Sequence, residues 1–209
     1  MTEFTEDEIA EIRRLSQYPF HCPNCDAVFE AAVRGGAAEL FCSPLCREIA
    51  KYVRYARACR QDGRDQRPDV LEALLIREAH ILSGGYSTTA QARQVAPALR
   101  QQIIARDGGR CVRCGAPGTD IHHIDGDSND SGNLQLLCSE CHRQETLSHL
   151  QPVSMLPPDK QAQALALAQQ LDARVSAPEP LRFCDSTAWT QAWLKIVHWR
   201  VRAFKQRGA

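Results

Sequence analysis

Two short cysteine pairs in the middle of the sequence constrain the fold more than any other feature. Cys111 and Cys114 form one Cys-x-x-Cys pair, and Cys138 and Cys141 form a second. Four thiolates at this spacing can surround a tetrahedral zinc ion, and a structural zinc ion contributes free energy to folding. The sequence therefore predicts a zinc site that joins the two ends of this stretch.

Three histidines and an asparagine accompany these cysteines and are not needed for the zinc site. His122 and His123 are adjacent, Asn133 follows them, and His142 comes directly after the last cysteine. Because the cysteines already complete a tetrahedral site, the imidazoles are available for another metal and for acid–base chemistry. The alternatives are incidental packing of the paired histidines, or a zinc site that mixes cysteine and histidine.

The two histidines of the pair are expected to face different surroundings. The sequence predicts a β-hairpin with strands at 119–124 and 133–138, joined by a polar loop and followed by a helix that Ser139 can cap. Side chains alternate between the two faces of a strand, so His122 and His123 should lie on opposite faces and have different roles.

This arrangement resembles the HNH endonuclease family, whose core is a ββα-metal nuclease motif. The resemblance covers roughly residues 97–150. It rests on four segments in this order: Arg106-Asp-Gly-Gly-Arg-Cys111-x-x-Cys114-Gly, Ile121-His-His-Ile124, Asn133-Leu-x-Leu-Leu-Cys138 and Cys141-His142. It implies a metal-dependent enzyme that hydrolyses phosphodiester bonds in DNA.

The resemblance also implies a role for each matching residue. His123 would be the general base, and His122 and His142 would be ligands of a catalytic divalent cation. Asn133 would hold the loop closed and orient His123 by hydrogen bonding. Many members of the family have an aspartate in the place of His122.

The identity of the catalytic cation stays open. Two imidazoles suit manganese, nickel, cobalt or zinc better than magnesium, which prefers oxygen ligands. Asp120, Asp125 and Asp127 are close enough in sequence to supply an oxygen, so magnesium stays among the candidates.

A second cysteine module lies near the N-terminus and comprises Cys22, Cys25, Cys42 and Cys46. Ser43 can cap a helix that begins at Pro44, which would place Cys46 in the first helical turn. The module resembles a treble-clef zinc finger, here with Phe41-Cys42-Ser43. Disulfides or unrelated thiols are the alternative, but the acidic N-terminus lacks the apolar segment of a signal peptide. We therefore expect two structural zinc ions and a cytoplasmic protein, with Cys59 and Cys184 as buried apolar residues.

Charge gives no overall preference for nucleic acid, because 25 basic residues balance 25 acidic ones. Local asymmetry must supply any affinity for DNA. The predicted helix at 44–61 carries cations opposite its apolar face, which can follow a phosphate backbone or form a solvated surface. The expected DNA-contacting residues are Arg47, Lys51, Arg54, Arg57, Arg106 and Arg110.

Helical periodicity, caps and breakers predict further helices around the hairpin. They are expected at 5–15, 69–82, 97–107, 159–175 and 186–206, with a short one capped by Thr88. The last of these carries many cations and either packs against the fold or contacts DNA.

The sequence thus predicts an α+β, mostly helical fold with a small ββα nuclease core. We expect an N-terminal zinc finger at 1–62, a helical linker at 63–96, the HNH core at 97–150 and a helical region at 151–209. No apolar run is long enough to span a membrane. Double-stranded DNA is the expected partner, RNA is not excluded, and a homodimer is compatible. The competing interpretation is a zinc-stabilised DNA-binding protein without nuclease activity.

Overall fold

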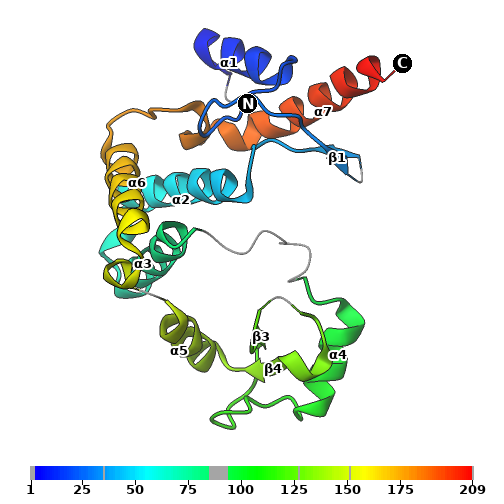
Figure 1. Ribbon diagram of the computed structural model, residues 1–209, viewed down its shortest axis with the longest axis vertical. Coiled ribbons are helices and arrows are strands. Elements are labelled where there is room, and N and C mark those ends of the chain that lie inside the picture. The colour runs from blue at the N-terminus through cyan, green and yellow to red at the C-terminus, as the bar shows by residue number, and fades with distance from the viewer. Residues whose placement is uncertain (1–2, 35, 85–93, 127, 151, 209) are drawn as a thin grey trace. The chain divides into compact units, whose positions relative to one another are not determined.

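The chain forms two compact units. Unit 1 comprises Met1–Gly85 and Val153–Ala209, and unit 2 comprises Tyr86–Pro152 (Figure 1). The region 1–62 and nearly all of 151–209, which the sequence suggests as separate parts, thus fall in one unit. The computed structural model describes residues 3–34, 36–84, 94–126, 128–150 and 152–208.

Unit 1 is built from helices and one short ribbon. Its elements are α1 (Glu6–Ser16), β1 (Val33–Arg34), β2 (Ala37–Ala38), α2 (Pro44–Gln61), α3 (Pro68–Leu82), α6 (Pro158–Ser176) and α7 (Trp189–Arg207). The starts of α1 and α2 follow from local chemistry. Thr5 and Glu8 form the predicted capping box. The Ser43 side chain accepts a hydrogen bond from the backbone N–H of Cys46, with Pro44 at the first position of α2.

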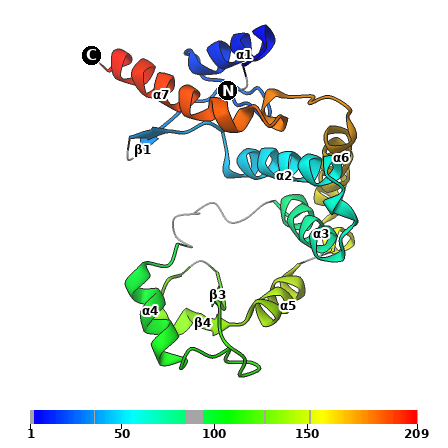
Figure 2. The ribbon, with the colours of Figure 1, turned by 180° about the vertical axis from the view of Figure 1, so that it is seen from behind.

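Helix α2 contributes to two apolar clusters of unit 1. On one side, Val53 and Cys59 pack with Leu74 of α3 and Leu171 of α6. On another side, Ala50 belongs to a cluster with residues of α1 and α7, which lie side by side in both views (Figure 2). Because α2 is covered on more than one side, less of its surface meets solvent than its sequence pattern suggests.

Two buried arginines connect α6 and α7 to the N-terminal cysteine module. Arg200 is fully buried and donates hydrogen bonds to the backbone carbonyls of Leu15, His21, Glu39 and Leu40. Arg174 forms an ion pair with buried Asp185 and donates to the side chain of Asn24. These bonds satisfy otherwise buried polar groups, and they tie residues from both ends of the chain into one unit.

Unit 2 contains a β-hairpin with a helix on each flank. Its elements are α4 (Pro97–Arg106), β3 (Asp120–His123), β4 (Leu134–Leu137) and α5 (Ser139–His149). Strands β3 and β4 are antiparallel, and His123 pairs with Leu134. The short helix expected after Thr88 lies outside the described residues.

Close packing fixes the hairpin of unit 2. Ile103 of α4 packs on Leu134 and Leu136, all three almost fully buried. Gly118 lies against Leu136 so closely that a methyl group on Gly118 would overlap the leucine side chain. The carboxylate of Asp107 accepts a hydrogen bond from the Leu136 backbone N–H, so the end of α4 is also tied to β4.

The two units together give the mostly helical α+β fold that the sequence predicts. Among the described residues, no helix is both long enough and apolar enough to span a membrane.

Candidate active site

The cysteines of unit 2 converge as the sequence predicts. Cys111 and Cys114 lie on a turn before β3, whereas Cys138 and Cys141 lie at the start of α5. Their four Sγ atoms all lie within 4.8 Å of one another, and Cys114 and Cys138 are 3.6 Å apart. A tetrahedral zinc ion with Zn–S bonds of about 2.3 Å separates its sulfurs by about 3.8 Å. The donor set therefore fits a structural zinc ion.

The N-terminal cysteine module forms a similar cluster. The Sγ atoms of Cys22, Cys25, Cys42 and Cys46 lie within 4.8 Å of one another. The separations are 3.5 Å for Cys25–Cys42 and 3.6 Å for Cys42–Cys46. All of these thiols are free rather than joined in disulfides, and the wider spacing in sequence between Cys42 and Cys46 does not keep them apart. This cluster also fits zinc.

On the hairpin of unit 2, His122 faces α5. Its ring centroid lies 5.3 Å from that of His142 and 6.4 Å from that of His149. Burial lowers the pKa of His122, and the neighbouring His142 lowers it further, which favours the neutral imidazole that binds metals. The structure therefore brings together the two histidines that the sequence singled out as metal ligands.

Helix α5 adds two donors that the sequence reasoning missed. One ligand atom from each of His122, Glu145 and His149 lies within 4.8 Å of the others. Glu145 and His149 are one helical turn apart, so both side chains lie on the same side of α5. Arg113, from the turn between Cys111 and Cys114, donates to Oε1 of Glu145 at 2.6 Å. The other carboxylate oxygen, Oε2, lies 3.7 Å from Nε2 of His149.

His123 lies on the opposite face of β3 and has its own hydrogen-bond partner. Its Nε2 is 2.9 Å from Oδ1 of Asn129, whose Nδ2 donates to the backbone carbonyl of Gln94. Since an amide oxygen only accepts, Nε2 carries the proton and Nδ1 carries the lone pair. The orientation of the Asn129 amide thus favours the tautomer of His123 with its proton on Nε2.

Asn133 closes the loop but does not contact His123. Its side chain accepts from the backbone N–H of Asp125 and donates to the carbonyls of Asp125 and Ser128. The expectation that Asn133 itself orients His123 is therefore corrected, because Asn129 makes that hydrogen bond. Asn133 holds the loop in which Asn129 lies. The sequence alone does not show which of these two amides contacts His123.

Of the three candidate oxygen donors near the hairpin, the two aspartates that the structure describes, Asp120 and Asp125, do not join the histidine cluster. Asp120 accepts hydrogen bonds from the hydroxyls of Thr119 and Ser139. The expectation that Ser139 caps α5 is wrong: Ser139 is the first residue of the helix, and Cys138 is the N-cap residue, whose sulfur accepts from the N–H of Cys141. Asp125 is not a member of any candidate metal group in the described part of the chain. Asp127 lies outside the described residues.

The cations of α2 do not form one exposed stripe. Arg47 and Lys51 are exposed, but Arg54 is half-buried and Arg57 is 5% exposed. Arg57 donates to the backbone carbonyls of Arg174, Ala177 and Pro178, so its donors are largely used inside unit 1. The prediction that Arg57 faces a phosphate backbone with the other three is therefore wrong, because the segment that covers it comes from the C-terminal part of the chain.

The basic residues before the hairpin are exposed and also bonded to the fold. Arg106 forms an ion pair with Asp107 and donates to the carbonyls of Ser131 and Leu134. Arg110 donates to the carbonyl of Gly115. Their role as DNA contacts stays a prediction.

The family comparison agrees with this geometry. Residues 111–147 match the family model described as HNH endonuclease, which includes the second cysteine cluster, His122, His123, Asn133, His142 and Glu145. His149 lies two positions beyond the matched segment. Comparisons with curated proteins and with solved structures give no match. Residues 111–147 of this chain thus match the HNH endonuclease family, and the cysteine cluster within them is compatible with zinc.

Proposed function

We propose that this protein is a metal-dependent HNH-type endonuclease that hydrolyses phosphodiester bonds in DNA. The main support is that two adjacent histidines of β3, within the matched segment, lie in different environments. His122 faces donors on α5, and His123 faces an amide on the other side. A protein that only binds DNA has no chemical need for this division.

His122, with His142, Glu145 and His149 of α5, would hold the catalytic cation. The ligand atoms of His122, Glu145 and His149 form a mixed nitrogen and oxygen donor set, with the His142 ring next to His122. This set suits manganese or another transition metal and supplies one oxygen that magnesium could use. When bound, such a cation supplies charge neutralisation at the phosphate and stabilises the leaving oxygen. The Arg113 side chain fixes the orientation of the Glu145 carboxylate by holding its other oxygen.

His123 would take a proton from water. The proton on Nε2 is committed to Asn129, so the free lone pair on Nδ1 is the base. Histidine is the side chain that most often acts as a general base in enzymes.

The central test is cleavage of supercoiled plasmid by purified protein with magnesium, manganese, nickel or cobalt. We expect cleavage by the wild type, and a loss of about 10²–10⁴-fold in His123→Ala, as is typical when a general base is removed. His198→Ala, which removes an exposed histidine from α7, is the matched control and should cleave normally. DNA affinity and zinc content should be unchanged in both variants. If the wild type binds DNA but cuts nothing with any of these metals, the protein is the zinc-stabilised DNA-binding module instead.

A second prediction concerns Glu145. Glu145→Gln should weaken manganese binding at least about tenfold. Loss of a residue that only hydrogen-bonds to a metal ligand typically lowers metal affinity about 10–100-fold, and loss of a carboxylate ligand itself should lower it at least as much. Titration of bound manganese by electron paramagnetic resonance measures this directly. Glu140→Gln, an exposed carboxylate on the same helix, serves as the control. Equal manganese affinity in Glu145→Gln and the wild type would remove Glu145 from the ligand set without excluding nuclease activity.

A further inference from the structure

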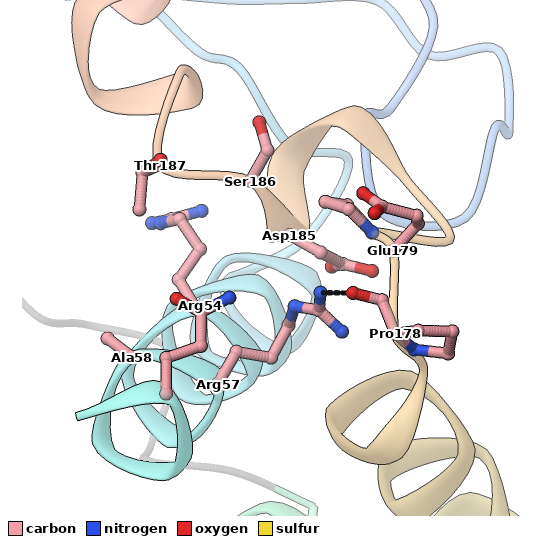
Figure 3. Close-up of a pocket in the computed structure, with 10 residues that line it drawn as sticks. Arg54, Arg57, Ala58, Pro178, Glu179, Asp185, Ser186 and Thr187 are labelled. Atoms are coloured by element: carbon pink, nitrogen blue, oxygen red, sulfur yellow. Dashed lines mark hydrogen bonds between the residues drawn. The ribbon is translucent and has the colours of Figure 1, made fainter. Parts of the chain in front are cut away.

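A cavity of unit 1 lies between α2 and the segment that leads into α7. It has a volume of about 270 Å³. Figure 3 shows Arg54 and Arg57 extending from α2 toward this segment, with the Arg54 guanidinium beside Thr187. Its lining residues are Arg54, Arg57, Ala58, Gln61, Pro178, Glu179, Pro180, Asp185, Ser186 and Thr187.

The two arginines bring positive charge that the surrounding protein does not neutralise by direct pairing. Arg54 donates from Nη1 to the carbonyl of Cys184, and Arg57 donates only to backbone carbonyls. Within the described residues, neither arginine forms an ion pair with a carboxylate, and Nε and Nη2 of Arg54 have no hydrogen-bond partner. The Arg54 guanidinium also lies 6.0 Å from the centroid of the Trp189 ring. Arg54 is half-buried, and burial lowers its pKa, while the nearby Asp185 carboxylate acts in the opposite direction. A desolvated cation of this kind is stabilised by an anion.

The lining also contains the carboxylates of Asp185 and Glu179, and within the described residues neither forms an ion pair with Arg54 or Arg57. Asp185 is 2% exposed and is paired with Arg174, and its carboxylate also accepts from the backbone N–H of Arg182. Glu179 is exposed. The hydroxyl of Thr187 and the amide of Gln61 add neutral donors to the lining.

We propose that this cavity binds a phosphate group, with Arg54 as its principal ligand. Guanidinium groups form charge-assisted, bidentate hydrogen bonds with phosphate oxygens. The volume is slightly below the range of about 300–1,000 Å³ for drug-sized ligands, so the site suits a phosphate with a small attached group. The phosphate can belong to a free nucleotide or to a nucleic acid end or backbone. This proposal does not depend on hydrolysis in unit 2.

The test measures binding to the full-length zinc-loaded protein by calorimetry and thermal unfolding. The probes are inorganic phosphate, adenosine monophosphate, and short DNA duplexes with or without a 5′-phosphate. We expect binding to raise the unfolding midpoint by mass action, whereas chloride at equal ionic strength should not. Arg54→Met should weaken binding at least about tenfold, because it removes charge-assisted hydrogen bonds. Arg13→Met, at an exposed arginine of α1 outside the cavity, should bind as the wild type does.

A second variant covers the case in which Arg54→Met does not fold. Thr187→Glu places a carboxylate at an exposed lining position next to the start of α7, where a negative charge is tolerated by the helix. It should abolish binding of the phosphate probes without lowering stability. Binding of phosphate and the mononucleotide identifies a small-molecule site, whereas binding of duplexes alone, dependent on Arg54, identifies nucleic acid. The proposal is overturned if no probe binds, or if Arg54→Met and Thr187→Glu both bind as the wild type does.

Discussion

His122 and His123 are neighbours in the chain but meet different partners in the fold. His122 faces the rings of His142 and His149, and His123 faces the amide of Asn129. The alternation of a β-strand makes this separation predictable from sequence, since adjacent side chains must point to opposite faces. The partners on α5 were harder to foresee. Glu145 and His149 are spaced one helical turn apart, but they belong to no motif that marks them as ligands. Only the packing of α5 against β3 shows that they lie close to His122.

At this scale we predict that Asn129 is a positioning residue for His123. Asn129→Ala should lower plasmid cleavage about tenfold or more, the usual effect of losing a hydrogen bond behind a catalytic group. Asn129→Asp should retain most activity, because a carboxylate also accepts the Nε2 proton. Ser128→Ala provides a control in the same loop. Full activity in Asn129→Ala would mean that the bond to Nε2 is dispensable.

At the scale of elements, the local sequence predicts where α1 and α2 begin. It also predicts the β-hairpin of unit 2. Capping residues and prolines set the helix starts, and the alternation of apolar residues marks β4. The burial of Arg57 could not be predicted from the sequence. Helix periodicity shows which side of a helix is apolar, but it does not show how many of its sides other segments cover. The residues that cover Arg57 lie more than a hundred positions away, and no local signal connects them.

Gly118 offers a test of hairpin packing. Gly118→Ala should destabilise unit 2 by about 1–3 kcal/mol, because the added methyl overlaps the buried Leu136 side chain and forces it to shift. Gly132→Ala is the control: it lies in the same unit, with open space around the added methyl. Its effect should stay within about 0.5 kcal/mol. Chemical denaturation of both variants compares them, and equal midpoints would show that the hairpin relaxes at no measurable cost.

At the scale of the molecule, the N-terminal cysteine module contacts residues from the C-terminal part of the chain within unit 1. Asn24 of that module binds Arg174, and the Cys184 thiol donates to the carbonyl of Pro23. Burial raises the pKa of Cys184 to about 12, so this thiol is unreactive in the folded unit. The spacing of the cysteines predicts the metal cluster, but not that α6 and α7 close around it.

We therefore predict that zinc removal opens unit 1 as well as the cysteine module. In the zinc-loaded protein at pH 8, Cys184 should resist alkylation by iodoacetamide. After zinc is removed by a chelator, Cys184 should be alkylated together with Cys22 and Cys25. The turn between Cys22 and Cys25, which contacts Cys184 through the Pro23 carbonyl, then loses the folding free energy that zinc supplies. Mass spectrometry of peptides reports each site. Continued protection of Cys184 after complete zinc loss would show that the α6–α7 region is stable without the metal.

The division of unit 1 between the two ends of the chain also has a consequence during synthesis. Arg200 completes hydrogen bonds to carbonyls of residues 15–40, yet it is made long after them. At about 5–20 residues per second, translation from residue 84 to residue 200 takes roughly 6–23 s. During this interval the N-terminal helices leave the ribosome without their partners, while the contiguous unit 2 emerges whole. We therefore expect the nascent N-terminal segment to expose, during this interval, apolar side chains that α6 and α7 later cover.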